Sequence, residues 1–533
     1  MPGWDRCQQY KPPPTHRRNC HARRCCDAPC KHQTHTSVEN QRPTKTYEHT
    51  NTNSLLGRTI HPLFLPLNRE LTFNDQLIYS GALLLADKKE RKNMLHFQGT
   101  FVDISPSGTL RIHDQSSLVC DAQGKITWIG DTAEAKKRFP NATLHTFQEG
   151  SFVLPGFVDC HIHFPQNRII GAVESDLLHW LDHHVWPEER KYKDEAFSKM
   201  MAQEFVHNLL SNGTTAALVF GSQFSSATDH LFEEGLRQQM ALVTGLTLQD
   251  RHTHPELEYT AREIRPHIES MISKWHQKER LRYVVTSRFS PACSPSLLKM
   301  MGEIIKQDSS LYFQTHINES HAEIEWVKQL FPECEDYLAS YEQFDLLTSR
   351  SVFAHSIHTT EHELKRMGQH QCSVAHCPSS NAFLGSGSFS FKKHKEHDVQ
   401  IAMGSDVAAG VSFSLWREMG HAHLIQMRLP EEERTFLDAT QMLSSVTIDG
   451  AKALRLDHEI GNFESGKWAD FIVFHPSKGR YLSKRFDECK DNSGHIDPKY
   501  IQKLLFQSAL SYEDDMISHT FVKGKPVFQR ECD

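Results

Sequence analysis

Short runs of β-branched and other apolar residues recur along the middle of the chain, with helical-period segments between most of them. The runs lie at 152–158, 214–220, 241–247, 283–287, 311–317, 351–355, 372–376 and 399–404. Between two of them, Ile324, Val327 and Phe331 fall on one helical face. Eight strands alternating with helices predict an α/β fold, a (β/α)8 TIM-like barrel. A doubly wound sheet is the alternative, but no G-x-G-x-x-G follows the first strand.

Both flanks of this region have a different, strand-rich pattern. Residues from about 76 to 150 and the C-terminal end alternate β-formers between Gly, Asp and Ser turns, and Gln123-Gly124 is typical of a hairpin turn. We expect the two flanks to pair into one small β-sandwich. The expected domains are the first half of the sandwich at 71–150, a metal-dependent barrel at 151–455, and the second half with a C-terminal segment at 456–533.

Residues 1–70 are rich in Pro, Cys, His and Arg and poor in aliphatic residues. Such a segment buries too little apolar surface to offset chain ordering, so we expect a disordered N-terminal extension. A targeting segment is an alternative, although Pro12–Pro14 interrupts any amphipathic helix. A zinc module is a further alternative, built from Cys25, Cys26, Cys30 and His32.

Composition and charge narrow the class of protein. No apolar run approaches the ~18 residues that a membrane helix needs. The formal net charge is −7, so no general affinity for nucleic acid or an anionic membrane is expected. Outside the first thirty residues the cysteines are scattered, and no secretory signal precedes the body. We therefore expect an intracellular, cytoplasmic protein with reduced thiols.

Polar side chains of the kinds that bind metals or move protons stand at the ends of the predicted strands. In a barrel these carboxyl ends meet at one rim, where active sites are built. The residues are His161 and His163 after the first strand, Arg288 and Phe289 after the fourth, His316 and Glu319 after the fifth, and His355, His376 and Asp406 after the last three.

The pair His161 and His163 predicts two ligands of a metal site. Side chains alternate along an extended strand, so both imidazoles point the same way. His316 and the carboxylate of Asp406 would complete a set that suits catalytic zinc, or iron, with one open position. Metal-bound water would then form hydroxide near neutral pH. The alternative is coincidence, because the chain has 35 histidines, but the joint pattern over four strands favours the metal.

Several motifs carry a family resemblance over roughly residues 95–530. PGFVDCHIH, THINES, FAHS, HCPSSN and GSDVAAG resemble the amidohydrolase superfamily and its purine and pyrimidine aminohydrolase branch. TSRFSPACS, NGTTAA, WPEER and FPQ are narrower, and are similar to the guanine deaminase family. The resemblance implies hydrolysis of guanine to xanthine and ammonia by a homodimer with one zinc per subunit.

The resemblance also implies roles for single residues. Glu319 would be the proton shuttle, and His355 would orient the metal-bound water. Asp406, already a predicted ligand, would take the water proton. Because Arg288-Phe289 stands where two-metal relatives have a bridging lysine, we expect one metal. Without the resemblance, Glu319 could be an ordinary acid in the first turn of a helix.

Guanine would be bound by residues around the same rim. Gln166 and Arg288 would hydrogen-bond the base, beside Phe289 as a stacking wall, and His316 and Glu319 would also contact it. The forked donors of Arg288 suit a carbonyl oxygen and reject an amino group there. Arg288 could instead form a rim ion pair, Phe289 could be core, and Gln166 could be surface.

Alternative functions remain open at this stage. A related aminohydrolase would act on an oxidised guanine, a pterin, an adenosine derivative or a triazine. A non-catalytic scaffold of the same fold is a third possibility, which the presence of every expected ligand and of Glu319 argues against. The chain is expected to take a small purine, not a nucleic acid or a membrane.

Overall fold

The computed structural model describes residues 94–174, 177–478, 481–489 and 497–531. The predictions made for residues 1–70 concern residues outside this described part. None of the described helices is both long and apolar enough to cross a membrane.

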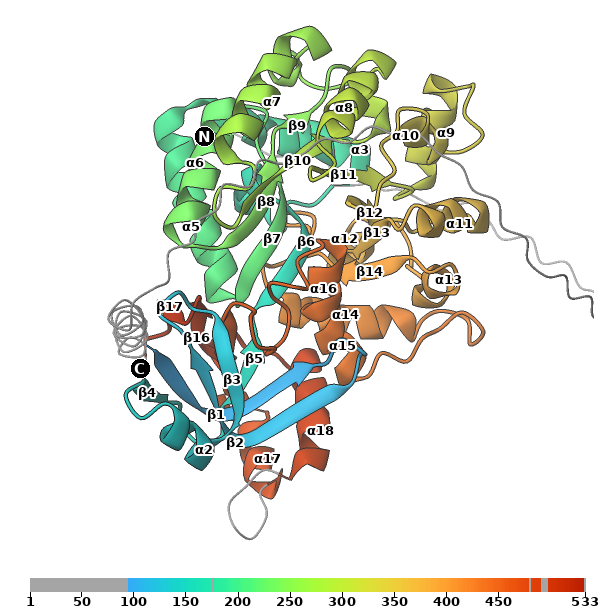
Figure 1. Ribbon diagram of the computed structural model, residues 1–533. Helices are drawn as coiled ribbons and strands as arrows, with labels where there is room; N and C mark the ends of the chain where they lie inside the picture. The colour runs from blue at the N-terminus through green and yellow to red at the C-terminus, as the bar shows by residue number, and fades with distance from the viewer. Residues whose placement is uncertain (1–93, 175–176, 479–480, 490–496, 532–533) are drawn as a thin grey trace, which may run out of the picture. The chain divides into compact units, whose positions relative to one another are not determined.

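Eight parallel strands form the predicted barrel, in the order in which they occur in the sequence (Figure 1). They are β6 (Phe157–His163), β7 (Thr214–Phe220), β8 (Ala241–Gly245), β10 (Leu281–Ser287), β11 (Tyr312–Ile317), β12 (Ser351–His355), β13 (Ser373–His376) and β14 (Gln400–Met403). The short β9 (Thr247–Leu248) adds to β10. The main-chain N–H of Asp406 donates to the carbonyl of His161 at 2.8 Å, which joins the segment after β14 to β6. The (β/α)8 prediction is therefore confirmed.

Helices follow the strands and cover the outside of the barrel (Figure 1). The main helices of the described chain are α5 (Glu195–Ser211), α6 (Ser225–Arg237), α7 (Ala261–Trp275), α8 (Pro295–Gln307), α9 (His321–Leu330), α11 (Glu361–Gln369), α12 (Pro378–Phe383), α13 (Phe391–Glu396), α14 (Leu415–Gln426), α15 (Ala439–Ser445), α16 (Ile448–Ala453) and α18 (Pro498–Leu510). Several begin with a capping box. In α9 the Ser320 hydroxyl accepts from the N–H of Glu323, and the Glu323 carboxylate accepts from the N–H of Ser320.

Strands from both chain ends form a second, eight-stranded sheet, as expected for the β-rich flanks. Its strands are β1 (Leu95–Ile104), β2 (Leu110–Cys120), β3 (Ile126–Asp131), β4 (Thr143–Thr146), β5 (Phe152–Pro155), β15 (Phe471–Phe474), β16 (Ile517–Val522) and β17 (Lys525–Gln529). Alternate residues face opposite sides. Phe471 stacks on Phe521 on one side, while Ile472 and Phe474 pack into the main core on the other.

The apolar run 152–158 was predicted as one strand, and this is wrong. It is divided at Gly156 between β5 of the end sheet and β6 of the barrel. The chain passes very close to β7 here, because a Cβ at Gly156 would lie 2.1 Å from Oγ1 of Thr215. The glycine therefore permits the crossing from one sheet to the other.

Candidate metal centre and active site

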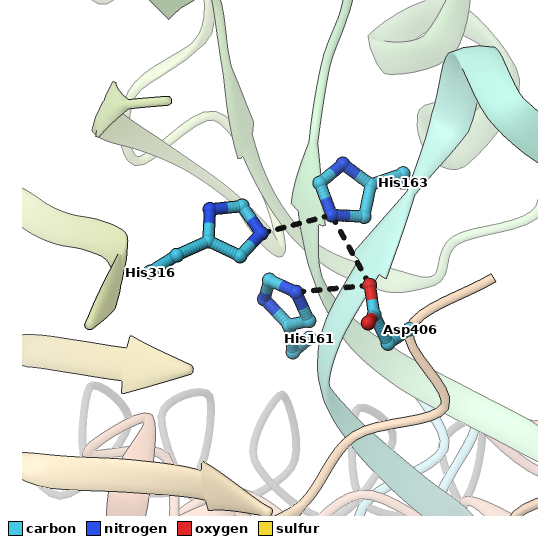
Figure 2. Close-up of side chains that lie close together, drawn as sticks. All are labelled: His161, His163, His316 and Asp406. Atoms are coloured by element: carbon cyan, nitrogen blue, oxygen red, sulfur yellow. Dashed lines mark hydrogen bonds and ion pairs between the residues drawn. The ribbon is translucent and has the colours of Figure 1, made fainter. Parts of the chain in front are cut away.

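Four side chains from distant parts of the sequence converge at the carboxyl end of the barrel (Figure 2). They are His161 and His163 on β6, His316 on β11, and Asp406 just after β14. One ligand-type atom from each lies within 4.8 Å of the others. The three imidazoles and the carboxylate are buried, except that His316 is partly exposed.

A β-bulge decides which way the paired histidines face. Val158 and Cys160 pack inside the barrel, whereas Ile162 packs in the layer towards the helices. The pairing of β6 with β7 shifts between Asp159 and Ile162, which reverses the alternation and turns His161 inward. The N–H of His161 donates to Oδ1 of Asp159 at 3.1 Å. The sequence prediction that the two imidazoles share a side did not include this bulge.

The ring nitrogens are arranged around a common point. Nε2 of His161 and Nε2 of His163 lie 3.1 Å and 3.2 Å from Oδ1 of Asp406. Nε2 of His163 also lies 3.2 Å from Nε2 of His316. Nε2 of His161 is buried and makes no well-formed hydrogen bond, despite its distance to Asp406. The lone pairs of these ring nitrogens and of the carboxylate oxygen face one another with no proton between them, and this arrangement favours a bound cation.

The electrostatics favour the protonation states that metal binding requires. Burial lowers the pKa of His163 to about 4, and burial also lowers the pKa values of His161 and His316. Burial alone would raise the pKa of Asp406, but His161 and the other imidazoles hold it well below its usual value. Three neutral imidazoles and one carboxylate are the forms that ligate a metal. The residues present therefore fit a divalent cation.

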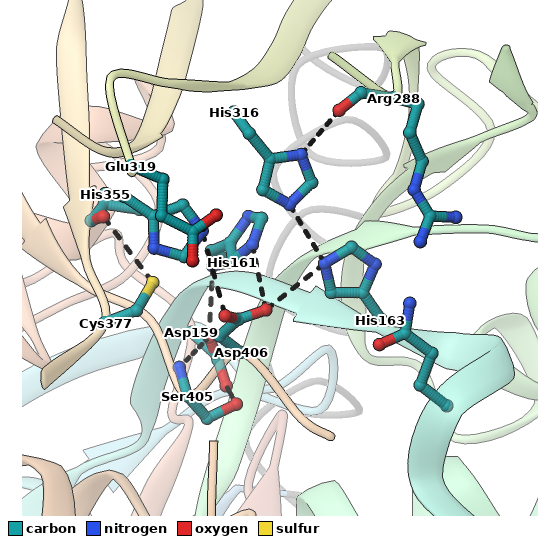
Figure 3. Close-up of polar contacts among 12 residues, drawn as sticks. Asp159, His161, His163, Arg288, His316, Glu319, His355, Cys377, Ser405 and Asp406 are labelled. Carbon is teal, nitrogen blue, oxygen red and sulfur yellow. Dashed lines mark hydrogen bonds and ion pairs between the residues drawn. The ribbon is translucent and has the colours of Figure 1, made fainter. Parts of the chain in front are cut away.

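Glu319 and His355 lie beside this cluster (Figure 3). Oε2 of Glu319 is 3.5 Å from Nε2 of His355, which is 3.8 Å from Oδ2 of Asp406. Burial, and then the Asp406 charge, raise the pKa of Glu319 to about 8. His355 and Asp406 have positive φ angles of 70° and 49°. Left-handed backbone at non-glycine residues is concentrated at functional sites.

A cavity opens onto the cluster. Its wall includes Arg288, Gln166 and Phe289, in addition to His163, His316, Asp406 and Glu319. All three are buried. Phe289 packs edge-on against Trp326, with ring centroids 6.0 Å apart. The residues expected to bind a base therefore lie around the same cavity as the cation ligands.

Some residues around this cavity were not predicted as site residues from the sequence. Leu177, Trp180 and Leu181 line it. The carboxylate of Glu189 contacts both Gln166 and Arg288. Glu189 lies in the WPEER motif, but its role could not be predicted, since its partners are 23 and 99 residues away.

Comparisons with known proteins agree with this geometry. Residues 152–527 match the model of the amidohydrolase family. The chain is 37% identical to a probable guanine deaminase of Deinococcus radiodurans over 80% of this chain and 95% of that protein. It is 34% identical to guanine deaminase of Escherichia coli over 81% and 97%. A crystal structure of guanine deaminase from Bradyrhizobium japonicum superposes with a TM-score of 0.79, at 30% identity over 82% of this chain and all of that chain.

Proposed function

The chain belongs to the amidohydrolase family, and from this premise we propose that it is a guanine deaminase, which hydrolyses guanine to xanthine and ammonia. One observation carries the proposal: the cavity that Arg288 and Gln166 line also contains the His163, His316 and Asp406 side chains. The relatives named guanine deaminase support it, since two of them match over more than nine-tenths of their own length.

We propose that His161, His163, His316 and Asp406 hold one divalent cation, and that this cation is zinc. Three neutral imidazoles and one carboxylate are typical of catalytic zinc, and iron is the alternative for the same set. Metal dependence is typical of the family. The cation, when bound, supplies the Lewis acidity that activates water near neutral pH. Elemental analysis of the purified protein distinguishes zinc from iron.

Glu319 is the residue that we assign to proton transfer. Burial and then the Asp406 charge raise the pKa of its carboxyl group to about 8, and the Ser386 hydroxyl donates to it at 3.2 Å. Asp406 accepts the proton released by the attacking water. Glu319 then gives its proton to the ring nitrogen beside the attacked carbon, takes up the hydroxyl proton of the tetrahedral adduct, and passes it to the departing amine as the carbonyl forms. The proton held by Asp406 finally restores Glu319. His355 lies between these two carboxyl groups and orients the attacking water.

Arg288 and Gln166 are the residues that we assign to recognition of the base. Both are buried, so a polar edge of the substrate that left them without partners would bind poorly. The Arg288 guanidinium suits the carbonyl oxygen of guanine, and the Phe289 ring offers a wall for its planar face. His316 and Glu319 complete the contacts on the side of the attacked carbon.

We further propose that the enzyme is a cytoplasmic homodimer, as the family resemblance implies. Burial raises the pKa values of the Cys160 and Cys293 thiols. Buried protonated thiols of this kind are unreactive, which suits a reducing compartment. Light scattering coupled to size-exclusion chromatography tests the oligomeric state.

A substrate panel tests the proposed activity. The metal-loaded protein is incubated with guanine, 8-oxoguanine, adenine, cytosine and a pterin, and ammonia release is measured. We expect turnover of guanine, and a loss of about 10³-fold in Glu319→Gln, since general acid–base groups contribute about 10²–10⁴-fold. Ammonia from adenine or cytosine, but not from guanine, contradicts the assignment.

A further inference from the structure

A buried carboxylate, Glu189, connects the two residues that we assign to base recognition. Glu189 ends the short helix α4 (Trp186–Glu189) and is fully buried. Its Oε1 accepts from Nη1 of Arg288 at 2.6 Å and from Nε2 of Gln166 at 3.1 Å. Its Oε2 accepts from Nε2 of Gln223 at 2.8 Å. One carboxylate therefore joins residues that follow β6, β7 and β10.

The contact with Glu189 fixes the orientation of the Gln166 amide. A carboxylate beside a guanidinium is ionised and can only accept hydrogen bonds. The amide must therefore turn its NH2 group towards Glu189, which leaves its Oε1 as the group available to the cavity. Gln166 Oε1 has no hydrogen-bond partner among the described residues. A neutral amide at position 189 would allow the Gln166 amide to flip.

The same contact fixes the donors that Arg288 offers. Only Nη1 is bonded to Glu189, and within the described chain Nε and Nη2 of Arg288 form no hydrogen bond. Arg288 lines the cavity, so its remaining N–H groups are available there. The cavity wall thus has an acceptor at Gln166 and donors at Arg288. This order is complementary to an N–H group next to a carbonyl oxygen, the lactam edge of a 6-oxopurine.

We propose that Glu189 is a positioning residue that makes this site selective for a purine with a lactam edge over one with an amino group at C6. The inference rests on the proposed guanine deaminase activity and adds the group that sets its specificity. Glu189 acts through Gln166 and Arg288 and does not itself line the cavity. A 6-amino purine brings a donor to the Arg288 donors and an acceptor to Gln166 Oε1, so both contacts are lost.

The test compares guanine with 2,6-diaminopurine, which has the same amine at C2 but an amino group at C6. In Glu189→Gln we expect kcat/KM for guanine to fall about 100-fold, mainly through KM, because buried polar groups are mispaired. The preference for guanine over 2,6-diaminopurine should narrow at least about 10-fold, since a flipped Gln166 amide then offers a donor. If Glu189 had a purely structural role, the variant would lower kcat/KM for both substrates by the same factor.

Glu188→Gln is the matched control. Glu188 is the preceding residue and is also buried, but its carboxylate pairs with Lys191 at 2.5 Å. It makes no hydrogen bond with Gln166 or Arg288 in the described chain. We expect this variant to keep the wild-type kcat/KM for both purines. An equal loss of selectivity in Glu188→Gln would overturn the proposal.

The double variant Glu189→Gln with Gln166→Glu gives a second test, which also applies if the single variant does not fold. A carboxylate at 166 presents an acceptor whatever its orientation, and the amide at 189 can donate to it. We expect the preference for guanine to be restored. The inference about Glu189 is overturned if Glu189→Gln keeps the wild-type preference for guanine, or if the double variant prefers 2,6-diaminopurine. Neither result affects the proposed function. A wild-type protein inactive on both purines overturns the proposed function as well.

Discussion

The main-chain carbonyl oxygen of Arg288 accepts a hydrogen bond from Nδ1 of His316 at 2.5 Å. A carbonyl cannot donate, so the proton is on Nδ1 and the lone pair of Nε2 faces the other imidazoles. The side chain of Arg288 points to a different partner, Glu189. One residue therefore orients a proposed cation ligand through its backbone and contacts the cavity through its side chain.

These separate roles of the Arg288 backbone and side chain predict the behaviour of Arg288→Ala. The main-chain carbonyl remains, so the variant should retain its cation, while KM for guanine rises about 100-fold because a buried bidentate donor is lost. Steady-state kinetics and metal analysis of the same preparation check both parts. Arg288→Lys should also fail to restore KM, since an ammonium lacks the forked geometry. Loss of the metal from Arg288→Ala would contradict the assignment of separate roles to the backbone and the side chain of Arg288.

Asn381 is predicted to position His355. Oδ1 of Asn381 lies 2.9 Å from Nδ1 of His355, which leaves Nε2 of His355 towards Glu319 and Asp406. Asn381→Ala should lower kcat about 10–100-fold with the cation retained, as for partners that orient groups around a metal. Asn381→Asp keeps the acceptor and should recover most of kcat. If the alanine variant instead changes only KM, His355 is not held through this bond.

The pH dependence of kcat/KM should follow the protonation of Glu319. Burial and the Asp406 charge raise its pKa to about 8, and the protonated form is the proposed donor. The rate therefore declines as the pH rises through this pKa. A bound cation lowers the pKa, so the decline begins at or below about pH 8. The residual rate of Glu319→Gln should lack this decline, and an alkaline rise in the wild-type rate would contradict it.

A buried ion pair connects the barrel to the end sheet and should matter for stability only. Nη1 of Arg280, just before β10, donates to Oδ1 of Asp470, just before β15, at 3.1 Å, and Nη2 contacts Oδ2. Both side chains are buried. Arg280→Ala leaves an unpaired buried carboxylate and should lower the free energy of unfolding by about 3–5 kcal/mol. Denaturant titration measures this, and an unchanged midpoint would contradict it.

Much of the barrel could be predicted because its strands are fully buried apolar runs. The runs at 214–220 and 351–355 coincide with β7 and β12. The run at 152–158 misled, since apolar content alone does not distinguish one strand from two that belong to different sheets. The close approach of Thr215 to Gly156, which separates them, depends on tertiary packing.

The part of the site that depends on residue types at strand ends could be predicted from the sequence. The positions of His161, His163, His316 and Asp406 follow from strand ends that share one rim. The bulge that turns His161 inward and the contacts of Glu189 do not follow. Both arise from hydrogen bonds between segments far apart in the sequence, such as Ser405 Oγ donating to Asp159 at 2.6 Å, and no local spacing encodes them.

The most direct test of the account is to measure metal content and guanine turnover on the same sample during chelation and reloading. We expect one cation per chain, ammonia release in proportion to occupancy, and recovery when zinc is returned. His316→Ala, which removes a proposed ligand, should lose both the cation and the activity. Undiminished release of ammonia from guanine by the fully metal-free protein would contradict the central claim.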